Sequence, residues 1–305
     1  MLALSTGCWH LRLNFSTKKF KPKRSFCVYA NGFPSFLPAD VENIKDTFAR
    51  DLAQRIERLP VQVPSLKTSI MSSCVRPVMQ GRTDPVVLLH GFDSSVLEWR
   101  YMYPLLEEAG VDAWAIDILG WGFSGLESRP SCDVASKRNH LYQVSKLVLI
   151  DASVYAEGTG EMSKLPRAFA YAGVALLKSV PLRYYVINLA FKNLSFDVSV
   201  DWMKIGRLHC LYPWWEDATV NFMMNGGYNV IPLIKQVKQQ TLIIWGEDDQ
   251  IIRYKLAFRL HGELQDATLR TIPECGHLPH VERPRSVADL IIQFAQKASV
   301  QFSAV

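Results

Sequence analysis

Two stretches near the end of the chain carry residues suited to general-base chemistry. The apolar run 240–245 leads into Gly246-Glu-Asp-Asp249, and His277 follows a glycine about 28 positions later. An imidazole accepts a proton near neutral pH, and a carboxylate beside it fixes the tautomer and stabilises the charged ring. We therefore interpret His277 as a base and Asp249 as its acid partner. His280, close behind, is interpreted as a structural or supporting residue.

A third candidate lies at His90-Gly91-Phe92, directly after the aliphatic run Val86-Val-Leu-Leu89. Four aliphatic residues, two of them β-branched, are typical of a strand buried on both faces, and glycine permits a sharp bend after it. Ser95 and Glu98 have capping-box spacing, which predicts a helix from Ser95 to Gly110. The run therefore predicts a central parallel strand that ends at the rim of a site.

The elements that position these residues come in a recognisable order. A second strand is predicted over 111–118, followed by the turn Leu119-Gly-Trp-Gly-Phe-Ser124, and another over 144–150 that ends at Asp151. A general doubly wound α/β domain would also show strands and helices in alternation. The His-Gly-Phe turn, the Gly-x-x-Asp turn and the late Gly-His, in this order, resemble an α/β-hydrolase. The predicted fold class is a mostly parallel sheet flanked by helices, with a helical cap insertion.

The resemblance implies roles for the residues already named. Asp249 would be the triad acid, His277 the base, and His90, Gly91 and Phe92 an oxyanion loop in which the Phe92 amide is one donor. The closest group is that of plastid-targeted plant esterases and epoxide-hydrolase-like proteins. Such relatives cleave an ester or similar bond of a hydrophobic small molecule by a Ser-His-Asp mechanism. Asp151 stands where some members carry an alternative acid.

The chain departs from that family at the nucleophile. None of its 17 glycines begins a Gly-x-Ser-x-Gly elbow, and one strand-helix unit of roughly 30 residues is missing before Val144. A form without the elbow is expected to be inactive or to be a non-catalytic small-molecule-binding or regulatory protein. Ser124, Ser153 and Cys132 are the weak alternatives for a nucleophile. Loss of the unit would either leave two unpaired strand edges or let the neighbouring strands pair directly, with 146–151 beside the strand that precedes His90, since 125–143 is long enough for the crossover.

The whole chain divides into five predicted segments. Residues 1–39 are basic and lack acidic residues, which is typical of a chloroplast transit peptide with a processing region near 28–31, or of a disordered basic arm. Apolar residues at helical spacing after the N-cap candidate Asp40 predict a helix over 40–60, ended by Pro60. The predicted hydrolase core covers 61–153 and 240–305. Residues 154–239, rich in aromatic side chains, form the predicted cap.

Composition excludes several other functions. The net charge is +5, but six basic residues precede Asp40, the first acidic one, so the body has no basic surplus for nucleic acid. No run approaches the ~20 apolar residues of a membrane span. The six cysteines lack metal-ligand spacing and are expected to be reduced. We expect no cofactor or metal, and a hydrophobic small molecule as ligand.

Overall fold

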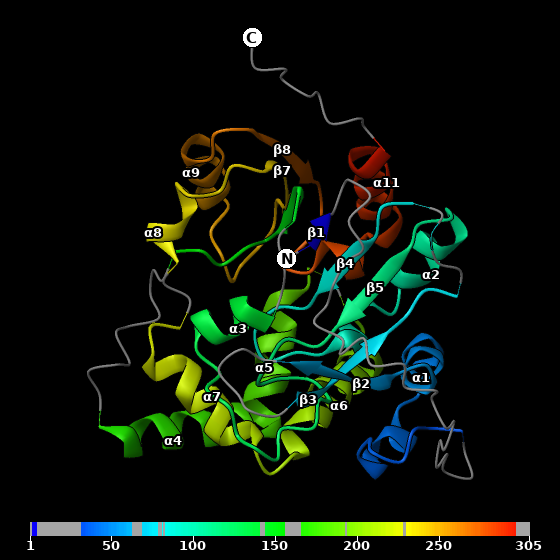
Figure 1. Ribbon diagram of the computed structural model, residues 1–305, viewed down its shortest axis with the longest axis vertical. Coiled ribbons are helices and arrows are strands. Elements are labelled where there is room, and N and C mark those ends of the chain that lie inside the picture. Colours follow the sequence, from blue (N-terminus) through cyan, green and yellow to red (C-terminus); the bar gives the residue numbers. More distant parts are fainter. Residues whose placement is uncertain are drawn as a thin grey trace.

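The protein is built on one central sheet with helices on both faces (Figure 1). The computed structural model describes residues 2–4, 32–62, 69–78, 81, 83–140, 144–155, 166–192, 194–227 and 230–296. The strand order is β2-β3-β5-β4-β1-β6-β7-β8. Parallel pairs join β4 (Val86–Leu89) to β5 (Ala113–Ile116), and β6 (Lys146–Ile150) to β7 (Gln240–Gly246) and β8 (Ala267–Ile272). The α/β class predicted from the sequence is confirmed.

Successive residues of the inner strands enter two different cores. In β6 and β7, Val148 and Ile244 pack in the cluster that includes α2 (Met102–Glu108) and α11 (Pro284–Gln296). Their neighbours Leu149 and Ile243 pack in the cluster that includes α9 (Lys255–Glu263). Side chains on a strand alternate between faces, so unbroken apolar runs are needed where both faces are covered. Each such buried side chain stabilises the fold by about 1.5–3 kcal/mol.

The segment after β4 does not form the single helix that the sequence predicts. It forms a 3₁₀ turn, η2 (Val96–Trp99), and then α2, and Gly110 follows in the left-handed conformation at φ +73°. Ser95 accepts a hydrogen bond from the Leu97 amide at 3.4 Å, while the Glu98 carboxylate accepts one from the Gly91 amide at 3.3 Å. The capping-box interpretation is therefore wrong, because Glu98 reaches back to the turn after β4.

The long helix predicted over 40–60 is also wrong. The chain forms the 3₁₀ helix η1 (Ala39–Asn43), the helix α1 (Thr47–Gln54) with Asp46 as its N-cap, and the strand β2 (Glu57–Gln62). β2 contains Pro60, which is tolerated because β2 lies at the edge of the sheet and pairs only with β3 (Ser69–Val75). β3 lies within 61–153, the first predicted segment of the core.

Between β4 and β6 lies a strand from the other end of the sequence. β1 (Leu2–Leu4) pairs antiparallel with both of them, so that Ala3 is opposite Val87 and Leu147. The expected direct pairing of β6 with β4 is therefore wrong. Residues 1 and 5–31 of the predicted transit peptide lie outside the described residues. Phe33 and Leu37, at its end, are buried in the main core.

A helical insertion separates β6 from β7 in the sequence. We use this name for its described residues between 166 and 234. Figure 1 shows α4 to α7 gathered at one end of the sheet, with α4 outermost. Its elements are α4 (Arg167–Leu177), α5 (Val180–Ala190), α6 (Phe196–Arg207), η4 (Leu208–Leu211), α7 (Trp215–Met224) and α8 (Ile231–Ile234). Among the described residues, no helix is both long and apolar enough to span a bilayer.

Candidate active site at the rim of the sheet

The candidate residues lie where parallel strands end. Asp151 directly follows β6, Asp249 follows β7, His277 follows β8, and His90 follows β4. In a parallel sheet these carboxyl ends share one edge, which is where open α/β sheets bind ligands. The sequence spacing therefore becomes spatial proximity at one rim.

His277 and Asp249 are joined by a hydrogen bond. His277 Nδ1 lies 2.8 Å from Asp249 Oδ2, while Asp249 Oδ1 accepts the amides of Ile251 and Ile252 at 2.7 and 2.9 Å. The carboxylate is buried and the imidazole side chain is 21% exposed. Because Nδ1–H donates to Asp249, Nε2 carries the lone pair that can accept a proton. Among the described residues, no side chain hydrogen-bonds to that nitrogen.

The loops after β7 and β8 are fastened together through their backbones. The Asp248 amide donates to Cys275 O at 2.9 Å, and Glu247 donates to Ile272 O at 3.1 Å. Position 246 must be glycine, because a Cβ there would overlap the carbonyl oxygen of Gly276. This close approach fixes the spacing between the loops that carry Asp249 and His277.

Asp151 supplies a second carboxyl behind this pair. It is 4% exposed and φ is +39°, and its Oδ1 accepts the Gly246 amide at 3.0 Å. Burial, followed by the negative charge of Asp249, raises the pKa of Asp151 well above its usual range. The ligand atoms of Asp151, Asp249 and His277 lie within 4.8 Å of one another, which is close enough for a metal ion. His277 Nδ1 is already hydrogen-bonded to Asp249, which favours a proton relay over metal binding at this site.

The turn after β4 is held by buried polar contacts. His90 Nε2 accepts the Ile118 amide at 3.0 Å and Nδ1 donates to Gly91 O at 2.8 Å, so His90 is a neutral structural residue. Burial lowers its pKa to about 4. The Gly91 amide donates to Glu98, whose Oε1 lies 3.1 Å from His280 Nε2. Burial alone would raise the pKa of Glu98, but contact with His280 and His90 holds it at about 2.

Asp93, which sequence reasoning missed, ties the same turn to the helical insertion. It has φ +51° and accepts bonds from Arg183, from His209 Nε2 at 2.9 Å and from Trp215 Nε1 at 2.9 Å. Burial raises the pKa of Asp93, but Arg183 and the hydrogen bonds from His209 and Trp215 together outweigh burial and hold the pKa below the usual range. Cys210 completes a potential metal-binding group with Asp93 and His209, but the Arg183 cation already neutralises the carboxylate. The only local signal was an aspartate after His-Gly-Phe.

The proposed substitute nucleophiles are placed unfavourably. Ser124 is fully buried, and its Oγ accepts the Ser73 amide at 3.0 Å, on the β3 side of the sheet. Cys132 is buried and donates to Pro130 O, and burial raises its pKa to about 11, which disfavours the thiolate. Ser153 lies two residues after Asp151 and is partly buried. Within the described residues, neither serine hydrogen-bonds to His277.

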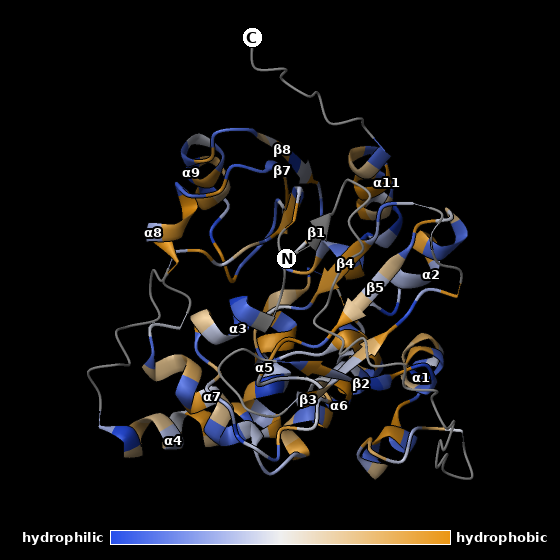
Figure 2. Cartoon of the chain, in the orientation of Figure 1, coloured by the Kyte–Doolittle hydropathy of each residue, from blue (hydrophilic) through white to orange (hydrophobic). Residues whose placement is uncertain are grey.

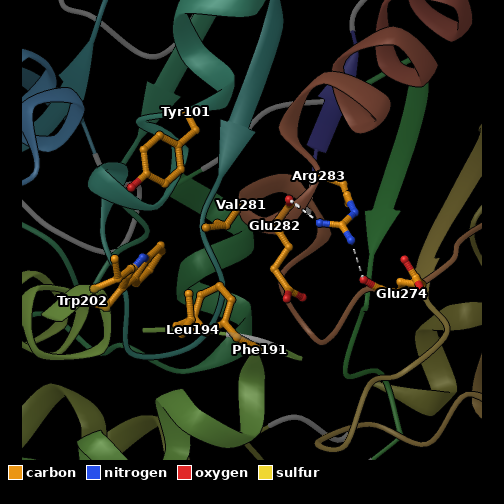
Figure 3. A pocket seen from close by; sticks show the side chains of 9 residues that line it. Tyr101, Phe191, Leu194, Trp202, Glu274, Val281, Glu282 and Arg283 are labelled. Atoms are coloured by element: carbon orange, nitrogen blue, oxygen red, sulfur yellow. Dashed lines mark hydrogen bonds between the residues drawn. The ribbon is translucent and has the colours of Figure 1, made fainter. Parts of the chain in front are cut away.

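A cavity of about 220 Å³ lies beside the His277 loop, and Figure 3 shows the side chains that line it. Its apolar wall contains Phe191 and Trp202 from the helical insertion, and its polar wall contains Glu274, Glu282 and Arg283 from the segment around His277. Glu282 accepts the Gly276 amide and, at 2.9 Å, the Lys192 amide. The His277 backbone amide donates to Ala190 O at 2.7 Å. His277 therefore lies where the helical insertion meets the core.

Comparisons with known proteins agree with this fold. A family described as "Alpha/beta hydrolase family" matches residues 134–290. The chain is 50% identical to the alpha/beta hydrolase domain-containing protein VTE7 of Arabidopsis thaliana, over 87% of this chain and 91% of that protein. It is 23% identical to the 2-hydroxy-6-oxo-6-(2'-aminophenyl)hexa-2,4-dienoic acid hydrolase of Metapseudomonas resinovorans, over 71% and 86% of the two chains.

Solved structures share the fold at low sequence identity. A bromoperoxidase from Bacillus anthracis superimposes with a TM-score of 0.61 at 14% identity, over 78% of this chain and 99% of that one. The meta-cleavage product hydrolase CumD gives 0.59 at 16% identity, over 75% and 96%. The Arabidopsis alignment runs over 300 residues but covers 87% of these 305, which leaves about 35 positions without a counterpart here. That number is close to the size of one strand-helix unit.

Proposed function

Because the chain belongs to the α/β-hydrolase family, we propose that its site descends from serine hydrolases and lacks their acylation step. The complete relatives would hydrolyse an ester or similar bond of a hydrophobic small molecule by a Ser-His-Asp mechanism. One observation carries the proposal. Between β5 and β6 the described chain holds only the helix α3 (Val134–His140), and the sequence has no Gly-x-Ser-x-Gly.

The retained half of the machinery is the base and its acid. In the proposed ancestral reaction, His277 Nε2 takes the proton of a serine hydroxyl as that oxygen attacks the carbonyl carbon. Asp249 holds the Nδ1–H and stabilises the imidazolium that forms, as supported by the 2.8 Å contact. The carboxyl of Asp151, held protonated behind Asp249, prevents a second negative charge from competing for the ring.

The missing half contains the nucleophile and one oxyanion donor. In this fold the second donor is the amide that follows the nucleophile, so one deletion removes both groups. Loss of a single oxyanion donor typically lowers kcat about 100- to 1000-fold, and loss of the serine leaves only residual rate enhancement. We therefore expect His277 and Asp249 to remain without a hydroxyl to activate.

A fluorophosphonate probe tests the proposal directly. The purified full chain is incubated with the probe, and labelled peptides are identified by mass spectrometry. In parallel, a strand-Gly-x-Ser-x-Gly-helix unit is inserted after Gln143, with a matched insertion that carries alanine in place of the serine. We expect labelling only of the serine-bearing insertion. Labelling of the natural chain at one serine would show an activated nucleophile and overturn the proposal.

A second candidate is a small-molecule-binding protein without turnover. The cavity beside the His277 loop favours it, since Phe191 and Trp202 face a wall of charged residues there. In this proposal the helical insertion acts as a cap whose apolar side chains contact the ligand. Hydrophobic esters that raise Tm without being converted to product would support binding. Multiple turnover of any of them would exclude this candidate.

For location, we propose import into the chloroplast. The basic, acid-free sequence before Asp40 and the Arabidopsis relative support this proposal. Fusion of residues 1–39 to a fluorescent protein in plant cells tests it. Fluorescence that remains in the cytosol would contradict it.

A further inference from the structure

The cavity beside the His277 loop has an apolar side and a polar side. The helical insertion and α10 (Pro279–Glu282) supply the apolar side chains, which are Phe191, Leu194, Val198, Trp202 and Val281. The ring centroids of Phe191 and Trp202 lie 5.1 Å apart. Hydrophobic and hydrophilic residues are interspersed along α6, so this helix can line the cavity and meet solvent at once (Figure 2). An apolar group of a ligand can therefore be buried against the insertion.

Arg283 is held at the polar side by two backbone carbonyl oxygens. Its guanidinium donates to Glu274 O at 3.0 Å and to Glu282 O at 3.3 Å, as the dashed lines in Figure 3 show. Glu274 has φ +50°, a conformation that is costly for a residue with a side chain and that clusters at ligand sites. Among the described residues, the other N–H groups of Arg283 have no acceptor and its charge has no carboxylate partner. Arg283 therefore keeps donors available to a molecule in the cavity.

Carboxylates at the polar side would repel an anionic ligand. The Glu282 carboxylate accepts the Gly276 amide and, at 2.9 Å, the Lys192 amide, so it is ordered beside the cavity. Glu274 also lines the cavity and is exposed, and none of the described side chains pairs with its carboxylate. The Lys192 ammonium pairs with Asp248 at 2.7 Å and so offsets a different carboxylate. A ligand carboxylate on Arg283 would therefore face two like charges.

Cations around the cavity would repel a cationic ligand in the same way. Besides Arg283, Arg100 lies against Trp202, with its guanidinium carbon 3.6 Å from the indole centroid, and pairs with Asp46 at 2.7 Å. The same guanidinium lies 4.6 Å from the Tyr101 ring, so an internal cation already uses both rings. A neutral oxygen, by contrast, accepts a hydrogen bond from Arg283 and meets neither repulsion.

We propose that the cavity binds a neutral molecule whose oxygen accepts a hydrogen bond from Arg283. An alcohol, ketone or ester oxygen fits this role, and the attached ring or branched carbon group packs against Phe191 and Trp202. The volume of about 220 Å³ is smaller than the roughly 300–1,000 Å³ of pockets that enclose a drug-sized ligand. The cavity therefore takes one ring or short branch, and a longer chain of the same molecule would lie outside it.

This inference rests on the second candidate function, a binding protein without turnover, and names the class of its ligand. A ketone has no bond that a hydrolase cleaves, so its binding is measured independently of turnover. Failure of the ketone to bind would leave the fluorophosphonate result unchanged. Turnover of an ester would exclude the second candidate without changing how the ketone binds.

A ligand-observed NMR titration of the full chain tests the ligand class. It compares molecules of similar shape: acetophenone, which has a neutral carbonyl, benzoate, benzylammonium, and ethylbenzene, which lacks oxygen. Acetophenone is expected to bind at least about fivefold more tightly than each of the others, because only its oxygen can accept from Arg283 without facing a like charge. Equal or tighter binding of any of the other three, or no binding of acetophenone, would overturn the proposal.

Two variants place the ligand in this cavity. Arg283→Met removes the donors and keeps an apolar stem, so it should weaken acetophenone binding about fivefold and leave ethylbenzene binding unchanged. Val198→Trp, at a 40% exposed position that lines the cavity, should fill it and weaken acetophenone binding at least about tenfold. The matched control is Arg285→Met, at an exposed position of α11, which should bind like the natural chain.

Circular dichroism and Tm confirm that each variant is folded. Acetophenone binding that either cavity variant leaves unchanged would overturn the proposal. Equal losses of acetophenone and ethylbenzene binding in Arg283→Met would show that the side chain contributes packing and not a hydrogen bond, which would also overturn it.

Discussion

The rim formed by β7 and β8 differs sharply from the centre of the sheet between β4 and β6. At the rim, Asp249 and His277 are hydrogen-bonded and their loops are joined through four backbone groups. At the centre, β1 runs antiparallel to both neighbours and comes from residues 2–4. One region keeps its complete local geometry, whereas the other is filled by an unrelated piece of chain.

The difference follows from how each group is positioned. Asp249 and His277 each need one strand and the turn that follows it, and both strands are present. A serine nucleophile needs a strand, a strained turn and a helix in a single unit. Loss of that unit removes everything it carries, and leaves two strand edges that must pair with something else. The following predictions test this contrast, from the largest expected effect to the smallest.

The contact between Glu98 and His280 links the two regions, and its removal is expected to have the largest effect. Glu98→Gln should destabilise the protein by about 3 kcal/mol at pH 7, because the pKa of Glu98 is about 2 in the folded protein. The lowered pKa means that this stabilisation is present above the ordinary glutamate pKa and is lost as pH falls toward 2. Urea unfolding from pH 3 to 7 measures it. Glu108→Gln, at an exposed position of α2, is the control and should change little.

If the pH dependence of Glu98→Gln matches that of the natural chain, the link between the turn after β4 and His280 does not stabilise the fold. The two regions would then have to be treated as independent.

Ala3→Pro tests the centre of the sheet. Proline has no amide hydrogen, and Ala3 lies between Val87 and Leu147, so a ladder hydrogen bond is lost. We expect a loss of about 2 kcal/mol, measured by urea unfolding, and much less for Ala3→Gly, which keeps the amide. Equal stability of the proline variant and the natural chain would mean that β1 does not hold the gap closed.

Asp151→Asn tests the rim. The raised pKa of Asp151 means that the natural chain loses stability as pH rises above the ordinary aspartate range toward the folded pKa. Asparagine can still accept the Gly246 amide and donate toward Asp249, so the variant should avoid that loss. It should be more stable than the natural chain at pH 8. The advantage should vanish near pH 4.

Thermal unfolding across pH measures this difference, with Asp289→Asn at an exposed position of α11 as the control. The stability difference between Asp151→Asn and the natural chain is compared at pH 8 and at pH 4. If this difference is the same at both pH values, Asp151 is ionised in the folded protein. The two carboxylates would then share the site as anions.

Substitutions of Ser124 and Ser153 give the smallest expected effects, and Ser124→Ala has the larger of the two. The buried Ser73 amide would lose its acceptor, which should cost about 1 kcal/mol in the free energy of unfolding. Ser153→Ala, at a partly buried position, should change stability by less than about 0.5 kcal/mol. Neither should alter fluorophosphonate labelling. A change in labelling for either variant would return that serine to the site.

Removal of the predicted transit peptide would also remove β1, which gives a further test of the centre of the sheet. Removal of residues 1–30 would keep Phe33 and Leu37 in the core but would remove β1. The edges of β4 and β6 that pair with β1 would then have no partner strand. A processed chain should then be less stable and more prone to aggregate than the full chain, a difference that light scattering can follow. Equal behaviour of both chains would show that the sheet re-pairs without β1.

Local sequence predicted the parts of the protein that depend on near neighbours. The apolar runs of β4, β5, β6 and β7 appear where predicted, because burial on both faces requires unbroken aliphatic residues. The proximity of His277 and Asp249 was also predictable, since consecutive parallel strands bring their carboxyl ends to one rim.

Other features required the folded chain. The 40–60 segment reads as a helix because its apolar spacing fits one, yet pairing with β3 makes residues 57–62 a strand that tolerates Pro60 at an open edge. Asp93 finds Arg183, His209 and Trp215 more than 80 positions away, and no local pattern specifies such partners.

The sequence by itself predicted the α/β class, the strands β4 to β7 and the proximity of Asp249 to His277, and it contains no Gly-x-Ser-x-Gly motif. Only the tertiary structure decided that β1 occupies the gap, that Glu98 bridges to His280, and that Arg283 and Trp202 line one cavity. The physical reason is that strand propensity and turn chemistry are local. Pairing across a gap, burial of charge and the walls of a cavity are set by segments that meet only on folding.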